Sequence, residues 1–238
     1  MPPVFVYGVF LPTAANGVIL ITTKTGRKNT ELKFNYDIYG GFQETSREIP
    51  VLNATEYALL VNEAFAAGGQ AVPFPSVAGL GIGTNWQDEV FQKAPIVNHS
   101  LTMSGGTEKS TYSVGLSLLT QDGIVGGDKA NFKRYTTRVN FNTDLLEKLK
   151  LTTNIIYTGT NKKGLNEGGL GSVLFNSLNN APTFDVRSPG GAFTLAEGLG
   201  NEVINPLAQI ENTFNSTVVD KLSGKIGLNY NFLTDFTV

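Results

Sequence analysis

The sequence has no cysteine among its 238 residues, and it has a single histidine, His99. The lack of cysteine excludes disulfide bonds, thiolate metal sites and cysteine nucleophiles, and one histidine cannot form a multi-histidine metal site. With 18 basic and 20 acidic residues, the net charge is −2, so nucleic acid is not an expected partner. No apolar run reaches the roughly 18 residues that a membrane helix needs, although the strands of a membrane barrel would need no such run.

The beginning of the chain is also short of basic residues, because the first one is Lys24. A secretory signal begins with a basic region, so residues 1–13 are predicted not to act as a signal peptide. Residues 18–23 form an apolar, β-branched run between Gly17 and Gly26, which predicts a buried strand.

Alternation of apolar and polar residues is the main pattern in the rest of the chain. A strand has a period of two residues, so each alternating run gives one apolar and one polar face. Six such runs predict an antiparallel meander, and they cover residues 31–42, 97–103, 112–118, 134–142, 149–158 and 221–232. A further strand is predicted to begin at Asp235.

The predicted connections differ in length in a regular way. Those at 105–108 and 144–148 are short, whereas the loops at 43–96 and 159–217 are very long. Short helices are predicted inside the long loops at 53–67, 84–92 and 170–179, and residues 182–213 are predicted to be loop. Because alternate connections of a meander lie at opposite ends, one end should have tight turns and the other elaborate loops. Membrane β-barrels have this asymmetry.

The predicted fold class is therefore all-β, a partial transmembrane β-barrel made of about six antiparallel strands. Two alternatives stay open at this point. A soluble β-sandwich, for example a carbohydrate-binding module, would bury the apolar face against a second sheet. A small autonomous porin-like barrel would need about eight strands.

Several ordered motifs resemble the SusC/RagA family of TonB-dependent outer-membrane transporters. The stretch at 14–26 (AANGVILITTKTG) is similar to the end of that family's plug domain. Later matches follow in the family's order: 52–64 (LNATEYALLVNEA), 85–91 (NWQDEVF), 95–106, 123–125 (GIV), 132–135 (FKRY) and 205–208 (NPLA). Together they cover the chain from Ala14 onward.

The resemblance implies an internal fragment of such a transporter. Residues 1–28 would be the end of the plug, and residues 29–238 the first part of the barrel, with 43–96 and 159–217 as extracellular loops. The intact protein would lie in a bacterial outer membrane, in contact with lipid. It would take up oligosaccharides or peptides, driven by the TonB complex and assisted by a SusD-like surface lipoprotein. The fragment alone is expected to be inactive, and neither enzymatic activity nor a cofactor is expected.

No catalytic, cofactor-binding or metal-binding residues are predicted. The polar parity of the strands is where function is expected, and its lumen-facing candidates are Asp37, Arg138, Asn140, Asn154, Lys225 and Asn229. A solvated inner wall against the plug and direct contact with substrate are the two interpretations of this set. His99 falls on the apolar parity and is interpreted as an interface or packing residue. Trp86 is interpreted as a helix anchor in preference to a sugar platform.

Overall fold

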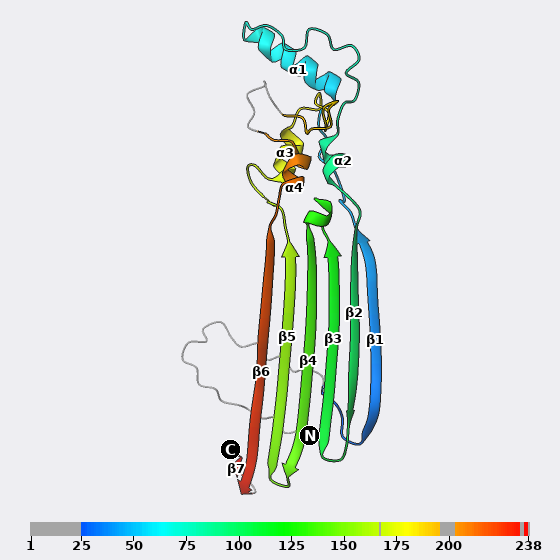
Figure 1. The fold of residues 1–238 in the computed structure, drawn as a ribbon, viewed down its shortest axis with the longest axis vertical. Coiled ribbons are helices and arrows are strands. Elements are labelled where there is room, and N and C mark those ends of the chain that lie inside the picture. Colours follow the sequence, from blue (N-terminus) through cyan, green and yellow to red (C-terminus); the bar gives the residue numbers. More distant parts are fainter. Residues whose placement is uncertain (1–24, 167, 196–202, 234–235, 238) are drawn as a thin grey trace.

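The computed structural model describes residues 25–166, 168–195, 203–233 and 236–237. The strand predicted at 18–23 lies outside these residues. A single curved sheet forms the lower part of the molecule in Figure 1, and the helices lie beyond its upper end. The strands are β1 (Thr30–Gln43), β2 (Ala94–Gly106), β3 (Ser110–Asp122), β4 (Asn131–Leu146), β5 (Leu149–Lys163), β6 (Ser216–Leu233) and β7 (Phe236–Thr237).

Each strand pairs antiparallel with the next along the chain, so the strand order is β1 to β7 without a crossover. The predicted meander is therefore confirmed. In the described residues the sheet is open, because β1 pairs only with β2 and not with β6 or β7. The sheet is thus a partial barrel wall.

β5 and β6 extend past their predicted bounds, at the end of the sheet that faces the helices. β5 continues to Lys163 and β6 begins at Ser216, and Gly159 pairs with Asp220 in this extension. Here β5 carries polar residues on both faces and β6 places Val218 and Val219 on opposite faces, so alternation disappears while the backbone ladder continues. Sequence periodicity detects a strand only where its two faces meet different surroundings.

The pairing register places all the apolar parities on one face. One row across the sheet runs Tyr36, Leu101, Leu116, Thr137, Tyr157 and Leu222. The next row runs Phe34, Met103, Val114, Val139, Ile155 and Gly224. A single slipped strand would turn its apolar residues to the other face, so the register of all five pairs agrees with one continuous apolar surface.

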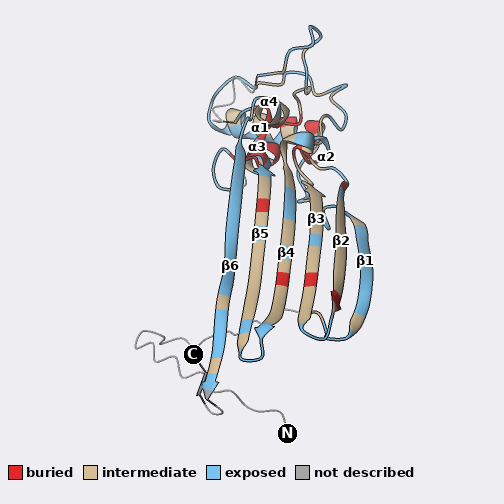
Figure 2. Ribbon diagram, turned by 60° about the horizontal axis from the view of Figure 1, so that its bottom comes forward, coloured by how far each residue is buried: buried red, intermediate tan, exposed pale blue. Residues whose placement is uncertain are grey.

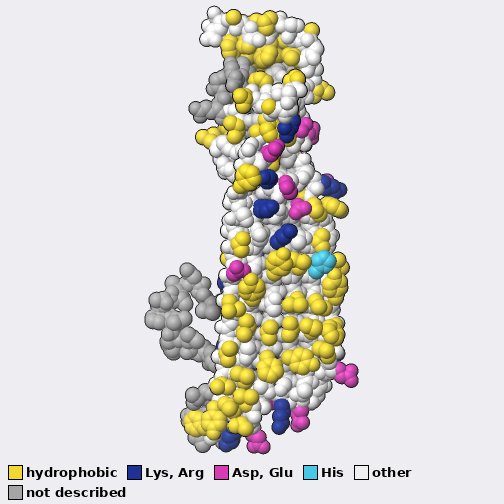
Figure 3. All heavy atoms as spheres, viewed as in Figure 1, with side chains coloured by type: hydrophobic (Ala, Val, Ile, Leu, Met, Phe, Trp, Pro, Cys, Tyr) yellow, Lys and Arg dark blue, Asp and Glu magenta, His cyan; other side chains and the backbone are white. Residues whose placement is uncertain are grey.

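This apolar face is exposed. Ile226 is 70% exposed, Leu222 73% and Ile38 63%, and among the described residues no second sheet covers them. A β-sandwich would bury such a face, so the structure does not support that alternative. In Figure 3 the face forms a yellow band, with charged side chains gathered above and below it.

The height of the band matches a bilayer. On β4 the face carries no charge from Tyr135 to Leu145, whereas Lys133 lies just above. At about 3.4 Å per residue this stretch is about 34 Å long. A tilt of about 40° reduces its height to about 26 Å, close to the apolar band of about 25 Å in outer-membrane barrels.

Four helices and a 3-10 turn lie at the long-loop end: α1 (Ala54–Ala67), α2 (Trp86–Val90), η1 (Gly127–Lys129), α3 (Val173–Asn179) and α4 (Pro206–Glu211). The three predicted helices are confirmed, and α1 has the capping box expected of Asn53 and Glu56. The prediction that residues 182–213 form only loop was wrong, because α4 lies within them. α4 has six residues, and its sequence signals are the Asn205 cap and Pro206 at its first turn. No described helix has the length and hydropathy to span a membrane.

The small hydrophobic core lies among these loops and helices. Val90, Leu165 and Val173 form its centre, and Phe91, Val125, Ala130, Leu207 and Ile210 pack against them. Figure 2 shows buried residues gathered here, whereas the sheet is mostly intermediate or exposed, with single buried residues on β2 to β5. In the described part of the chain, neither face of the sheet is therefore covered by a hydrophobic core.

An arginine placed on the apolar face should destabilise a membrane barrel that contains these strands. Ile226→Arg puts a charge near the middle of the band and should cost about 2–4 kcal/mol of unfolding free energy, because the charge meets lipid. Ser223→Arg, on the opposite parity of the same strand and also exposed, should cost much less. Urea titration of the two barrel variants in lipid vesicles measures the difference. Equal destabilisation would contradict the facing of β6.

Candidate functional site

The predicted lumen-lining residues all lie on the polar face. Asn140, Asn154 and Lys225 are register partners on β4, β5 and β6, so the structure brings these three side by side. Arg138 lies on the same face one row away, while Asp37 is on β1 and Asn229 is near the tight-turn end. Within the described part of the chain, the buried Oδ1 of Asn154 accepts no hydrogen bond. Whether this face lines a lumen stays a prediction.

The segment at 25–29 lies against the polar face at the tight-turn end. A side chain at Gly26 would overlap the backbone of Gly105 and Tyr112, so only glycine allows this close approach. Asn29 donates its backbone N–H to Thr107 O over 3.1 Å, and Lys28 forms an ion pair with Asp144 at the end of β4. Sequence periodicity missed this contact, because it joins residues far apart in the chain.

The two long loops interlock above the sheet. Trp86 in α2 is 2% exposed, and its indole Nε1 donates to Ala181 O in the other loop over 3.0 Å. Thr84 adds two more bonds, from its backbone N–H to Pro182 O at 2.9 Å and from its hydroxyl to Phe184 O at 2.7 Å. The interpretation of Trp86 as a helix anchor agrees with these contacts.

Amide side chains hold the loops in place by replacing backbone partners. Gln87 accepts from Ile49 N at 3.0 Å and donates to Ile49 O at 2.7 Å, so it binds that residue as a neighbouring strand would. Asn62 of α1 does the same to Phe74, over 2.9 and 2.7 Å. Phe74 in turn packs edge-on against Tyr57, and burial raises the pKa of the Tyr57 hydroxyl. These reciprocal pairs give irregular loops fixed conformations.

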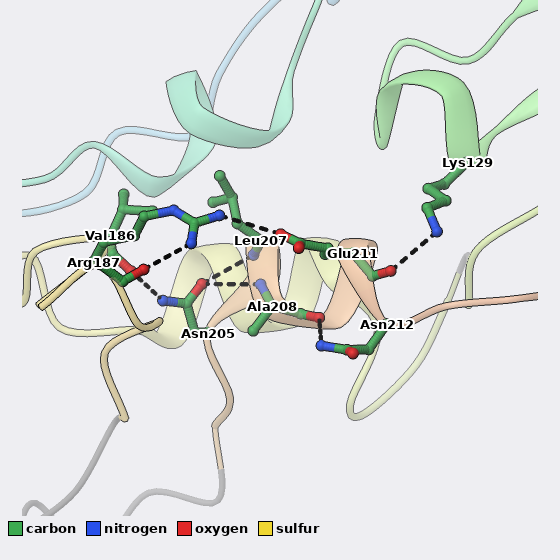
Figure 4. Close-up of polar contacts among 9 residues, drawn as sticks. Lys129, Val186, Arg187, Asn205, Leu207, Ala208, Glu211 and Asn212 are labelled. Atoms are coloured by element: carbon green, nitrogen blue, oxygen red, sulfur yellow. Dashed lines mark hydrogen bonds and ion pairs between the residues drawn. The ribbon is translucent and has the colours of Figure 1, made fainter.

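A cleft of about 330 Å³ opens between α2, η1 and α4. Its lining includes Arg187, whose guanidinium lies 3.9 Å from the centre of the Phe193 ring and 3.2 Å from Glu211 Oε2. Lys129 donates to Glu211 O over 3.0 Å, which places a second cation at the cleft (Figure 4). Glu89 and Asp128 add two carboxylates to the lining. Sequence reasoning missed this cleft, although the motifs at 85–91 and 205–208 each contribute residues to its lining.

Asn205 holds one wall of the cleft. Its Oδ1 accepts from Leu207 N at 3.0 Å and Ala208 N at 3.2 Å, which caps α4. Its Nδ2 donates to Val186 O at 2.9 Å (Figure 4) and to Thr194 O at 3.3 Å, so the same side chain fastens the loop that carries Arg187. The side chain is 3% exposed.

The cleft combines a planar cation on an aromatic ring with carboxylates and backbone carbonyls, which is chemistry for holding a polar solute. Among the described residues, no group of three or more His, Asp or Glu side chains is placed to hold a metal ion.

Comparison with known proteins places this architecture in a class. No family model matches the chain. TonB-dependent receptor SusC of Bacteroides thetaiotaomicron is 32% identical over 164 residues, which is 68% of this chain and 16% of that receptor. TonB-dependent receptor P3 of Formosa agariphila is 28% identical over 228 residues, 92% of this chain and 21% of the receptor.

Among solved structures, the RagAB peptide importer in its closed-closed state superposes with a TM-score of 0.74 at 19% identity, over 96% of this chain and 29% of that one. The open sheet is thus part of the barrel wall of a TonB-dependent outer-membrane receptor. More specifically, the chain belongs to the SusC/RagA family of these receptors, as its motifs predicted. It spans about a fifth of the length of the curated relatives, 21% for P3 and 16% for SusC.

Asn205→Asp should free the Arg187 loop while leaving α4 capped. Aspartate keeps the accepting oxygen, but it sets a carboxylate against the carbonyls of Val186 and Thr194 in place of a donor. The lost bonds and buried acceptors cost about 1–3 kcal/mol, so amide hydrogen exchange at 186–194 should accelerate at least several-fold. The control is Asn212→Asp, the same change at the exposed end of α4, where Nδ2 donates to Ala208 O over 2.9 Å. Equal acceleration in both variants would contradict the role given to Asn205.

Proposed function

We propose that this chain is part of a transporter that takes up oligosaccharides or peptides across a bacterial outer membrane, driven by the TonB complex. The observation that carries the proposal is a meander with a charge-free band of bilayer height on one face and a polar surface on the other. Its family membership supports the same activity. A SusD-like surface lipoprotein is the proposed partner above the loops.

In this proposal the long-loop end lies outside the cell and the tight-turn end faces the periplasm. Loops at 44–93, 123–130 and 164–215 gather at one end of the sheet, and the turns at 107–109 and 147–148 lie at the other (Figure 1). Outer-membrane barrels have short periplasmic turns and long external loops. The cleft beside Arg187 is then open to solutes that arrive from outside.

The polar face is proposed to line the lumen and to meet a plug formed from residues 1–28 and the chain before them in the intact protein. The contacts of residues 25–29 with the turn end of this face support that division. The buried Asn154 Oδ1, which accepts no bond from the described residues, supports a donor supplied by another part of the protein. Asp37, Arg138, Asn140, Lys225 and Asn229 complete the proposed lining.

Substitution in the cleft tests the proposed transport. In cells that depend on the complete receptor, Phe193→Ala should raise the half-saturating concentration for labelled oligosaccharide or peptide roughly tenfold, through loss of an aromatic contact. Phe214→Ala is the matched control, because Phe214 also lies under a cation, Lys129 at 4.0 Å, yet lies outside the cleft lining. Uptake of neither solute class, or uptake that persists without TonB, would overturn the proposal.

The chain alone should transport nothing. In the described residues the sheet has open edges at β1 and beyond β6 and β7, and each unsatisfied backbone group costs several kcal/mol in hydrocarbon. Expressed as residues 1–238 with a C-terminal tag, it should aggregate or be degraded, which fractionation and immunoblotting detect. Heat-modifiable, protease-resistant material in the outer membrane would favour the small autonomous barrel, and soluble monomer would favour the binding module.

A further inference from the structure

The apolar face carries a hollow near its long-loop end. Its volume is about 260 Å³, and its walls include Tyr36 and His99 on one side, Tyr135 on the other, and Leu116 and Thr137 between them. These residues come from β1, β2, β3 and β4, so the hollow crosses four strands at one level. It lies at the upper edge of the charge-free band.

Polar groups converge at the upper rim of this hollow, although it opens on an apolar surface. His99 Nδ1 is 2.7 Å from the Tyr36 hydroxyl, and this pair fixes the imidazole with its other nitrogen unbonded by any described residue. A histidine side chain that faces lipid loses its hydration. Its presence at this position therefore indicates that a polar group lies near its unbonded nitrogen. Tyr135, 51% exposed, adds a second hydroxyl on the facing wall.

A cation completes the rim. Lys133 follows the same parity as Tyr135 and lies one row nearer the loops, where it is exposed and has no ion-pair partner among the described residues. Asp220, the acidic residue at the level of Tyr135, is two strands away and accepts a 2.7 Å bond from Tyr157. Lys133 is therefore the cation in the row directly above Tyr135, and Asp122 lies on the same face one row further towards the loops.

We propose that the hollow binds one outer-leaflet lipid with an anionic headgroup. One acyl chain lies between Tyr36 and Tyr135 over Leu116, and the headgroup phosphate meets Lys133, the free nitrogen of His99 and the Tyr135 hydroxyl. Charge-assisted bonds to phosphate are the strong ones, and a basic residue at the surface adds attraction to anionic lipid. Neutral lipid fills the hollow without the headgroup contacts, so the site distinguishes lipids by charge.

This site rests on the proposed membrane barrel, but not on what the barrel transports. The test uses the complete receptor in a neutral detergent, with dioleoyl phosphatidylglycerol or dioleoyl phosphatidylcholine added, and native mass spectrometry to count the retained lipids. One phosphatidylglycerol should remain bound at lipid concentrations at which phosphatidylcholine does not. Lys133→Gln should weaken its retention about fivefold, whereas Lys221→Gln, on the polar face, should not.

Filling the hollow should abolish binding. Leu116→Trp blocks the acyl chain, and Leu222→Trp is the matched control in the same row outside the hollow. Heat-modifiable migration in gels establishes that each variant is folded. If the Leu116→Trp variant does not fold, Thr137→Phe fills the hollow from β4 instead. Equal retention of the two lipids, or retention unchanged by a folded hollow-filling variant, would overturn the proposal. Uptake by the same variants is measured separately, so a failed lipid site leaves the transport proposal intact.

Discussion

The constraint on which this structure depends is that a peptide group in hydrocarbon must find its hydrogen-bond partner within the protein. A meander meets it with local connections, because each strand pairs with its neighbour along the chain and the sheet needs no crossover. Once the backbone hydrogen bonds between strands are fixed, successive side chains point to opposite faces of the sheet, and the two faces meet different surroundings. The band on one face and the row of Asn140, Asn154 and Lys225 on the other are consequences of the same register.

Sequence reasoning predicted the sheet well because both of its signals are local. Alternation placed the strands, and the capping pair of Asn53 and Glu56 placed α1. It failed at the upper ends of β5 and β6, where apolar and polar residues no longer alternate, and at α4, a six-residue helix in a stretch predicted to be loop. The facing of the six polar candidates followed from parity, whereas their neighbours on other strands needed the register.

The cleft was beyond sequence reasoning for a different reason. It is built by single contacts between distant loops, such as Trp86 with Ala181 and Lys129 with Glu211, and no period or spacing encodes them. Amide side chains make many of these contacts. No sequence pattern distinguishes a buried asparagine that fastens a loop, such as Asn205, from an asparagine on the surface. The sheet follows from a repeated alternation of apolar and polar residues, which the sequence shows directly. The loops depend on individual hydrogen bonds between residues that only the folded chain brings together.

The interlocked loops have a geometric effect on the sheet below them. The tie between Trp86 and Ala181 joins the top of the β1–β2 hairpin to the connection between β5 and β6, and it spans the strands between them. At the other rim, Lys28 reaches from the start of β1 to Asp144 at the end of β4. Each contact fixes the distance between two separated strands, and for strands of fixed spacing that distance sets the curvature of the sheet between them. The curvature of this part of the sheet is therefore set at both of its ends by contacts within the chain itself.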